Sequence, residues 1–288
     1  MENKGNFLLQ LRGLLPSLNP AIRKIGEYIL NNPEKIKHLR IKDLAKECGV
    51  AESTITRFVR IINLESFQQL KIILAELTSE EAHGKIELVY DEVEKEDSIE
   101  QIADKILSIN IKALRDTRNL IDVREIERAI EAIDKAENID IYGAGGSFVA
   151  AENARMRLYR IGKRCIIYND PNQQAVSASL LTEKDVAIGI SNSGRTISTI
   201  NALKKAKESG ATTICITNYN QTPLTRYADI KLFTSTQDSA FFQESMVSRV
   251  AQIFILDIIY AGLAIKNFEQ SINRIEKSSN ALRDVLLT

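Results

Sequence analysis

Two short segments carry small polar side chains in a pattern that suits an anion. Gly143–Ser147 (GAGGS) follows the apolar run 139–142, and Ser191–Thr196 (SNSGRT) follows the apolar run 185–190. Each segment precedes a helical pattern, so each is expected at a helix N-terminus, where free N–H groups and a partial positive charge favour anions. Glycine lets the backbone approach a ligand, and hydroxyl groups add donors. We therefore predict a phosphate site.

Neither loop has a nucleotide-binding pattern. A GxGxxG fingerprint would need a glycine at position 148, where Phe148 stands, and no GxxxxGK[ST] motif occurs. The hydroxyl groups of Ser191, Ser193 and Thr196 could also serve only as helix caps. Two such loops in one sheet favour a ligand over that simpler interpretation.

The loops belong to an alternating pattern of strands and helices. Apolar runs without polar alternation, separated by helical patterns, occur at 139–142, 164–168, 185–190, 212–217 and 229–233. Such runs are typical of strands buried on both faces, and their alternation with helices predicts an α/β domain with a parallel sheet. Ligands bind outside the carboxyl ends of such strands, where both loops lie. A last helix is expected near residues 272–287.

The N-terminal part of the chain has a different pattern. Residues 1–78 carry apolar residues at spacings of three and four, which predicts helices throughout. Within them, residues 41–60 (IKDLAKECGVAESTITRFVR) have the layout of a helix-turn-helix. The small Ala45 allows two helices to cross, and Gly49 suits the turn between them. The expected shared core consists of Leu44, Ile55, Phe58 and Val59.

The second helix of this motif has the side chains for binding DNA. Glu52 or Ser53 can begin it, and no acid occurs from Ser53 to Leu64. Residues 35–71 hold eight lysines and arginines against four acids, although the whole chain has 38 of each sign. The N-terminus of such a helix reads base edges while basic side chains hold phosphates. The predicted DNA-binding residues are Ser53, Thr54, Thr56, Arg57 and Arg60. A helical hairpin with a solvated basic face is the alternative.

An acidic segment separates the two patterns. Eight acids and two lysines lie between residues 80 and 97, which suits a linker or a solvated helix. We therefore expect a helix-turn-helix domain over 1–78, a linker over 79–98 and an α/β domain over 99–288. This α/β domain is expected to begin with two helices before residue 139.

Composition limits the remaining possibilities. The three widely spaced cysteines are expected to be buried, reduced thiols of a cytoplasmic protein, and the N-terminus lacks the pattern of a signal peptide. Two histidines argue against a histidine-rich metal site, so neither metal nor cofactor is expected. Residues 246–265 are about as long as a membrane span, but Arg249, Gln252 and Asp257 interrupt them. We expect a buried helix or a subunit interface there, and no membrane partner.

The second half of the chain resembles a known family. GxGxS at Gly143, Gly145 and Ser147, followed by ISNSGRT, AKESGATTICIT and TPLTRYADI, is similar to the sugar isomerase (SIS) domain over about residues 120–265. The resemblance implies a flavodoxin-like parallel sheet with helices on both faces that binds phosphosugars. The implied effector-binding residues are Gly143, Gly145, Ser147, Ser191, Asn192, Ser193, Gly194, Thr196 and Glu244. Asn192 and Gly194 would contribute backbone N–H groups.

Glu244 has two interpretations of equal weight. The resemblance implies an acid near the sugar at this position. A carboxylate favoured by the dipole in the first turn of a helix explains the same residue.

The first half resembles the RpiR family of bacterial transcription regulators. The segments that carry this resemblance are NPEKI, IKDLAKECGVAESTITRFVRII and SFQQLK. The sequence departs from the family at residues 63–66 (NLES), where members often have a glycine-containing turn, and at Ala51, where many have serine. The resemblance implies a homodimer or homotetramer that binds a double-stranded DNA operator and senses a phosphosugar to control sugar-metabolism genes.

Two other classes of function compete with this one. An SIS enzyme, either a phosphosugar isomerase or an etherase, would need acid–base groups near its substrate. Both histidines lie outside the sugar domain, so Glu152 and Glu244 are the groups left for such chemistry. We expect no catalytic residue and no enzyme activity. A pure interaction protein would leave the joint presence of both loops and the DNA-type motif without explanation.

Overall fold

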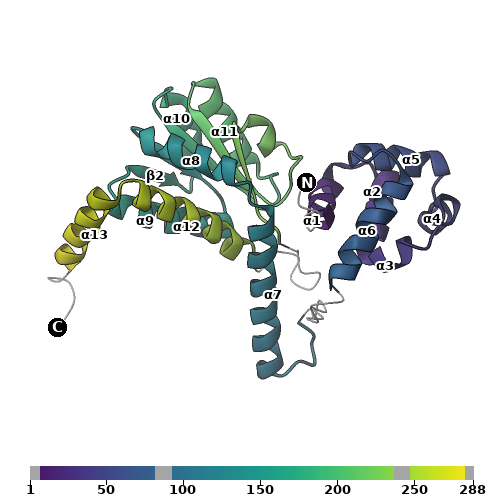
Figure 1. The fold of residues 1–288 in the computed structure, drawn as a ribbon. Helices are drawn as coiled ribbons and strands as arrows, with labels where there is room; N and C mark the ends of the chain where they lie inside the picture. Colours follow the sequence, from purple (N-terminus) through teal and green to yellow (C-terminus); the bar gives the residue numbers. More distant parts are fainter. Residues whose placement is uncertain (1–6, 82–92, 237–246, 283–288) are drawn as a thin grey trace. The chain divides into compact units, whose positions relative to one another are not determined.

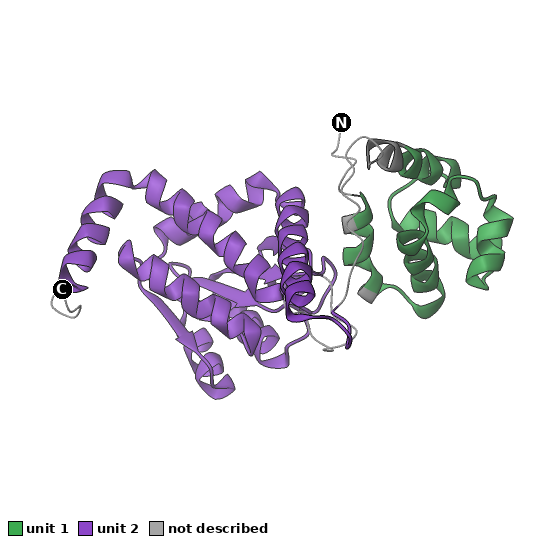
Figure 2. Ribbon diagram, turned by 90° about the horizontal axis from the view of Figure 1, so that it is seen from below, with its two compact units in different colours: residues 1–91 green, residues 92–288 purple. Residues whose placement is uncertain are grey.

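The chain folds into two compact units with separate cores. The computed structural model describes residues 7–81, 93–236 and 247–282, and it divides the chain into an N-terminal unit, 1–91, and a C-terminal unit, 92–288 (Figure 2). Each unit is described below by itself.

The described part of the N-terminal unit is helical, as predicted. Prolines at the first helical position begin α2 and α3, where a missing N–H costs no hydrogen bond. Asn19 caps α2 by accepting a hydrogen bond from the backbone N–H of Ile22 at 3.0 Å. The helices are α1 (Phe7–Leu14), α2 (Pro20–Asn31), α3 (Pro33–Ile36), α4 (Ile41–Cys48), α5 (Glu52–Ile61) and α6 (Phe67–Glu81), with a 3-10 turn at Leu15–Ser17.

The predicted helix-turn-helix is formed by α4 and α5. Gly49 ends α4 in the left-handed conformation with φ +65°, which lets the chain turn sharply. Helix α5 begins at Glu52, one of the two predicted starts. The predicted core residues Leu44, Ile55, Phe58 and Val59 are all buried in one cluster.

The C-terminal unit contains the predicted parallel sheet. All five apolar runs form strands, within one residue of the predicted bounds, and all pairings are parallel. The strand order is β2-β1-β3-β4-β5, the flavodoxin-like order. The strands are β1 (Ile139–Tyr142), β2 (Cys165–Tyr168), β3 (Val186–Ile190), β4 (Thr212–Thr217) and β5 (Ile230–Phe233).

Helices cover both faces of this sheet (Figure 1). One apolar cluster joins the sheet to α8 (Val123–Lys135), α9 (Gly146–Arg160) and α12 (Ser248–Lys266). The other joins it to α10 (Pro171–Leu180) and α11 (Ile197–Glu208). Burial of the central strands β1, β3 and β4 from both sides explains their mostly apolar sequences, whereas the edge strands β2 and β5 expose Ile166 and Lys231.

The remaining helices flank this layered core. Helix α7 (Ile99–Leu120) and helix α8 are the two helices predicted before residue 139. Helix α13 (Phe268–Leu282) begins four residues before the predicted start, because only Asn267 separates it from α12. A 3-10 turn, Leu224–Tyr227, lies between β4 and β5.

Helix α12 occupies the segment that resembled a membrane span. Among the described helices, it alone has the length and apolar composition to cross a membrane. Ala251, Ile255 and Ile259 are buried in the core of the C-terminal unit, so one face of α12 is the predicted buried helix. A third of the most apolar 18-residue stretch of α12 is buried, which leaves the opposite face of the helix partly exposed.

The three cysteines are free and buried, as predicted. Burial raises the pKa of the Cys165 and Cys215 thiols to about 12, so both are protonated at neutral pH.

The segment between the units is only partly described. Helix α6 extends to Glu81, three residues into the predicted linker. Ser98 caps α7, accepting from the N–H of Gln101 and donating its own N–H to the Gln101 side chain. Residues 82–92 lie outside the described part, so the boundaries at 78 and 98 remain a prediction.

Candidate functional site: two loops of the sheet and an exposed helix

The two predicted anion-binding loops begin on adjacent strands. β1 and β3 pair in parallel with Tyr142 opposite Gly189, so the loops Gly143–Ser147 and Ser191–Thr196 leave the sheet at the same edge. After β1 the chain continues to β2 on one side, and β3 lies on the other side. The loops therefore flank the point where the strand order reverses, which is where open α/β sheets bind ligands.

Glycines shape the first loop. Gly145 has φ +55° and ψ −128° and lies at the N-cap of α9, in a conformation that residues with a Cβ rarely adopt. A Cβ on Gly143 would lie 3.0 Å from the carbonyl oxygen of Ser147, a tight contact. Gly145 and Gly146 are exposed at the start of α9, where the first N–H groups of a helix have no intrahelical acceptor.

Two buried glutamines hold the first loop, and sequence reasoning did not identify them as site residues. Gln252 on α12 donates from Nε2 to Ser147 Oγ at 3.1 Å. Gln174 on α10 donates from Nε2 to the carbonyl oxygens of Tyr168 at 2.7 Å and of Gly143 at 3.4 Å. Gln252 stood out in the sequence only as a lone amide within a mostly apolar helix, whereas Gln174 follows Asn172 and Gln173 and has no such signal.

Hydrogen bonds among its own residues order the second loop. Ser191 is buried, and its hydroxyl lies 2.9 Å from that of Thr196. Ser193 is exposed and accepts a hydrogen bond from the N–H of Arg195 at 3.2 Å. The structure thus brings Ser191 and Thr196 together and leaves Ser193 at the surface of the same loop.

A network at the ends of β4 and β5 fixes Asn192. Its carbonyl oxygen accepts from the N–H of Asn218 at 2.9 Å and from the Thr217 hydroxyl at 3.2 Å. Its Oδ1 accepts from the Thr236 hydroxyl at 3.1 Å, and Thr236 in turn exchanges backbone–side-chain hydrogen bonds with Asn218. Asn218 and Thr236 follow predicted strands, and this position could have identified them as candidate site residues from the sequence.

Both the backbone conformation and the neighbouring Thr222 side chain require a glycine at position 194. Gly194 has φ +62°, and a Cβ there would lie 2.3 Å from Thr222 Oγ1. We expect Gly194→Ala to lower the free energy of unfolding by about 2 kcal/mol, because the left-handed conformation and the contact both oppose the methyl group. Urea unfolding of the purified variant measures this, with Gly146→Ala as the control, since a Cβ on Gly146 meets nothing within 4 Å.

Glu244 lies outside the described residues. The other eight predicted effector-binding residues lie in the two loops or in the first turn of α9.

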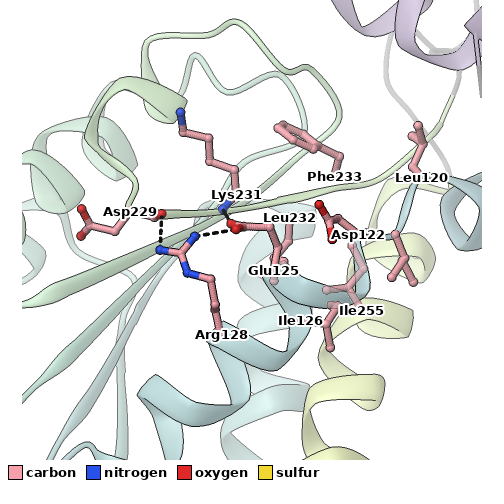
Figure 3. A pocket seen from close by; sticks show the side chains of 11 residues that line it. Leu120, Asp122, Glu125, Ile126, Arg128, Asp229, Lys231, Leu232, Phe233 and Ile255 are labelled. Atoms are coloured by element: carbon pink, nitrogen blue, oxygen red, sulfur yellow. Dashed lines mark hydrogen bonds and ion pairs between the residues drawn. The ribbon is translucent and has the colours of Figure 1, made fainter. Parts of the chain in front are cut away.

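A pocket lies elsewhere on this unit, along the outer side of β5 (Figure 3). Glu125 of α8 accepts a hydrogen bond from the backbone N–H of Lys231, and Arg128 donates to the carbonyl oxygen of Asp229. These bonds satisfy backbone groups of an edge strand that would otherwise stay unpaired. None of the predicted site residues lines this pocket.

The predicted DNA-binding residues lie on the free side of α5. Ser53, Thr56, Arg57 and Arg60 are exposed, and Thr54 is partly exposed. Ile55, Phe58 and Val59 point the opposite face into the core. The Thr56 hydroxyl also donates to the carbonyl oxygen of Glu52 at 3.3 Å.

Ion pairs distinguish α5 from the helices before it. Arg40 pairs with Asp43 at 2.9 Å, and Lys35 pairs with Glu47 at 3.4 Å. Within the described residues, Arg57 and Arg60 form no ion pair, so their charges remain available to phosphates or bases.

Comparisons with known families agree with both halves of the chain. Residues 5–81 match the helix-turn-helix domain of the rpiR family, and residues 132–261 match the SIS domain.

Relatives match along nearly the whole chain. A transcriptional regulator of the helix-turn-helix type from Caldanaerobacter subterraneus, described as uncharacterized, is 36% identical over 277 residues, which cover 96% of this chain and 97% of that protein. Another from Thermotoga maritima is 34% identical and covers 92% of this chain and 94% of its own length. The solved structure of Vibrio vulnificus NanR in complex with ManNAc-6P shares the fold, with a TM-score of 0.63 at 23% identity, over 98% of this chain and all of NanR. The chain therefore belongs to the RpiR family of helix-turn-helix transcriptional regulators that carry an SIS domain.

Proposed function

We propose that this regulator binds a phosphosugar between its two loops and thereby controls its binding to the operators of sugar-metabolism genes. The observation that carries this proposal is the position of both loops at the point where the strand order reverses. The N-termini of α9 and α11, together with the hydroxyls of Ser147, Ser191, Ser193 and Thr196, would supply the donors for a phosphate.

The DNA-binding half of the proposal rests on α5. Its N-terminal residues would read base edges in the major groove, while Arg57 and Arg60 would hold bases or phosphates. Two copies of the chain would read two half-sites about one helical turn, or a multiple, apart. Such a protein would act where the chromosome is, in the cytoplasm.

Pairing of two chains would use the exposed sides of α9 and α12. These helices pack against each other, and they expose Met156 and Tyr159 on α9 and Ala261 and Ile265 on α12. Neighbouring exposed apolar side chains favour a protein interface, and a two-fold operator favours a second copy as the occupant. A dimer or a tetramer satisfies this arrangement.

Two carboxylates near the first loop along the chain support a sensor rather than an enzyme. The Arg155 side chain binds Glu152 and holds the pKa of that carboxyl below its usual range. Asp140 is buried in β1, where it accepts hydrogen bonds from the hydroxyls of Tyr142 and Ser177. A general base needs access to the substrate, which the buried Asp140 lacks, and a lowered pKa makes Glu152 a weaker base. A phosphosugar isomerase or etherase is the second candidate.

Sugar binding would control the operator through a shift between arrangements of the protein. A ligand shifts such an equilibrium only as far as it binds one arrangement better than the other.

Thermal-shift measurements with sugar phosphates and their unphosphorylated parents test the proposal. A ligand present at 100 times its dissociation constant should stabilise the protein by about 2.7 kcal/mol. ManNAc-6P belongs in the panel because NanR is bound to it in the similar structure. We expect a stabilising ligand that needs its phosphate and is recovered unchanged. Recovery of a converted product would establish the isomerase or etherase instead.

A further inference from the structure

We propose that Gln252 is a positioning residue that directs the proton of the Ser147 hydroxyl toward the bound phosphate. This inference rests on the proposed phosphosugar site, since it concerns how one of its donors is oriented.

The contact between Gln252 and Ser147 determines whether the Ser147 hydroxyl can act as a hydrogen-bond donor toward a ligand. Gln252 is fully buried, Ser147 is 8% exposed, and Nε2 of Gln252 lies 3.1 Å from Ser147 Oγ. A serine hydroxyl has one proton and two acceptor lone pairs. When an amide N–H occupies a lone pair, the proton remains to be donated. Within the described residues, the Ser147 hydroxyl donates to no protein acceptor.

The unpaired oxygen of the Gln252 amide indicates that the N–H group, and not simple packing, explains a glutamine at this position. Gln252 Oε1 is buried and has no hydrogen-bond partner among the described residues. A buried carbonyl oxygen without a partner destabilises the folded chain, and an apolar side chain of similar size would avoid that cost. A glutamine that only filled space would therefore be a poor choice at this position.

Gln174 repeats the pattern from the opposite face of the sheet. It is buried on α10, its Nε2 donates to the carbonyl oxygens of Tyr168 and Gly143, and its Oε1 has no partner among the described residues. Lone pairs aimed at an anion repel it. The two glutamines engage the Gly143 carbonyl and the Ser147 hydroxyl oxygen as acceptors, which leaves donors to face the phosphate.

A double-mutant cycle with inorganic phosphate as the probe tests the role of Gln252. Phosphate affinity is obtained from thermal shifts of the full chain over a series of phosphate concentrations. We expect Gln252→Met and Ser147→Ala each to weaken phosphate binding about tenfold, the scale of one hydrogen bond to a charged group. The double variant should be no weaker than Ser147→Ala, because Gln252 acts only through that hydroxyl.

The melting temperature without phosphate separates positioning from simple packing. Since Gln252→Met removes an unpaired buried oxygen, we expect the unliganded variant to melt at the same temperature as the wild type or higher. If Gln252→Met does not fold, Gln252→Asn keeps an amide that is one methylene too short to reach Ser147 and should give the same loss.

Each remaining outcome decides a different claim. Additive losses in the double variant, or unchanged affinity in Gln252→Met, would overturn the role of Gln252 while leaving the phosphate site intact. Absence of any phosphate-dependent stabilisation in the wild type would overturn the site itself, and this inference with it.

Discussion

Replacing Arg57 and Arg60 together by alanine should weaken operator binding about 100-fold or more. Both arginines are exposed on α5 and form no ion pair within the described residues, so their charge is free to act on DNA. A base contact by arginine contributes about 1–3 kcal/mol, and each lost phosphate contact also lowers the salt dependence of binding by about one unit of slope. The fold should survive, because the buried face of α5 is unchanged.

Fluorescence anisotropy measures this effect, with an operator selected from random-sequence DNA and a series of salt concentrations. Arg115→Ala with Arg124→Ala is the matched control, because both arginines are exposed in the C-terminal unit and the net charge changes equally. Equal operator affinity in the wild type and the Arg57/Arg60 variant would contradict the assignment of α5 as the reading helix.

Replacing Ser191 and Ser193 together by alanine should abolish the response to sugar while leaving operator binding intact. The Ser191 hydroxyl contacts that of Thr196, and Ser193 lies at the surface of the same loop. Loss of two donors to a phosphate should weaken sugar binding about 100-fold, at roughly tenfold for each hydrogen bond to a charged group.

Operator binding is measured with and without the stabilising sugar phosphate. Ser179→Ala with Ser209→Ala is the control, because these serines lie at the C-terminal ends of α10 and α11, away from the loops. If the Ser191/Ser193 variant were well folded but no longer bound the operator, the proposed division of labour between the two units would be wrong.

The strands and the loops were readable from the sequence because their signals are local. Ile139–Tyr142 is apolar except for Asp140 since both faces of β1 are buried, and the glycines of the next segment mark where the strand gives way to a helix. The helix-turn-helix was readable for the same reason, since Gly49 and the apolar positions around it lie within about twenty residues.

The partners that hold the loops could not be predicted in this way. Gln252 lies 105 residues from Ser147, and Thr236 lies 44 residues from Asn192. A hydrogen bond between such residues depends on strand order and on how α12 crosses α9, which no local pattern of residues specifies. The start of α13 was missed for a smaller reason, since a single residue separates it from α12.

The two units have independent interiors, and this affects how such regulators can diversify. Among the described residues, the core of the N-terminal unit is made from residues between 7 and 74, and the clusters around the sheet come from residues after 120. A recombination event within the acidic segment would therefore cut neither interior. The same helix-turn-helix domain could be joined to a different C-terminal domain without repacking either part, so the two domains can evolve separately.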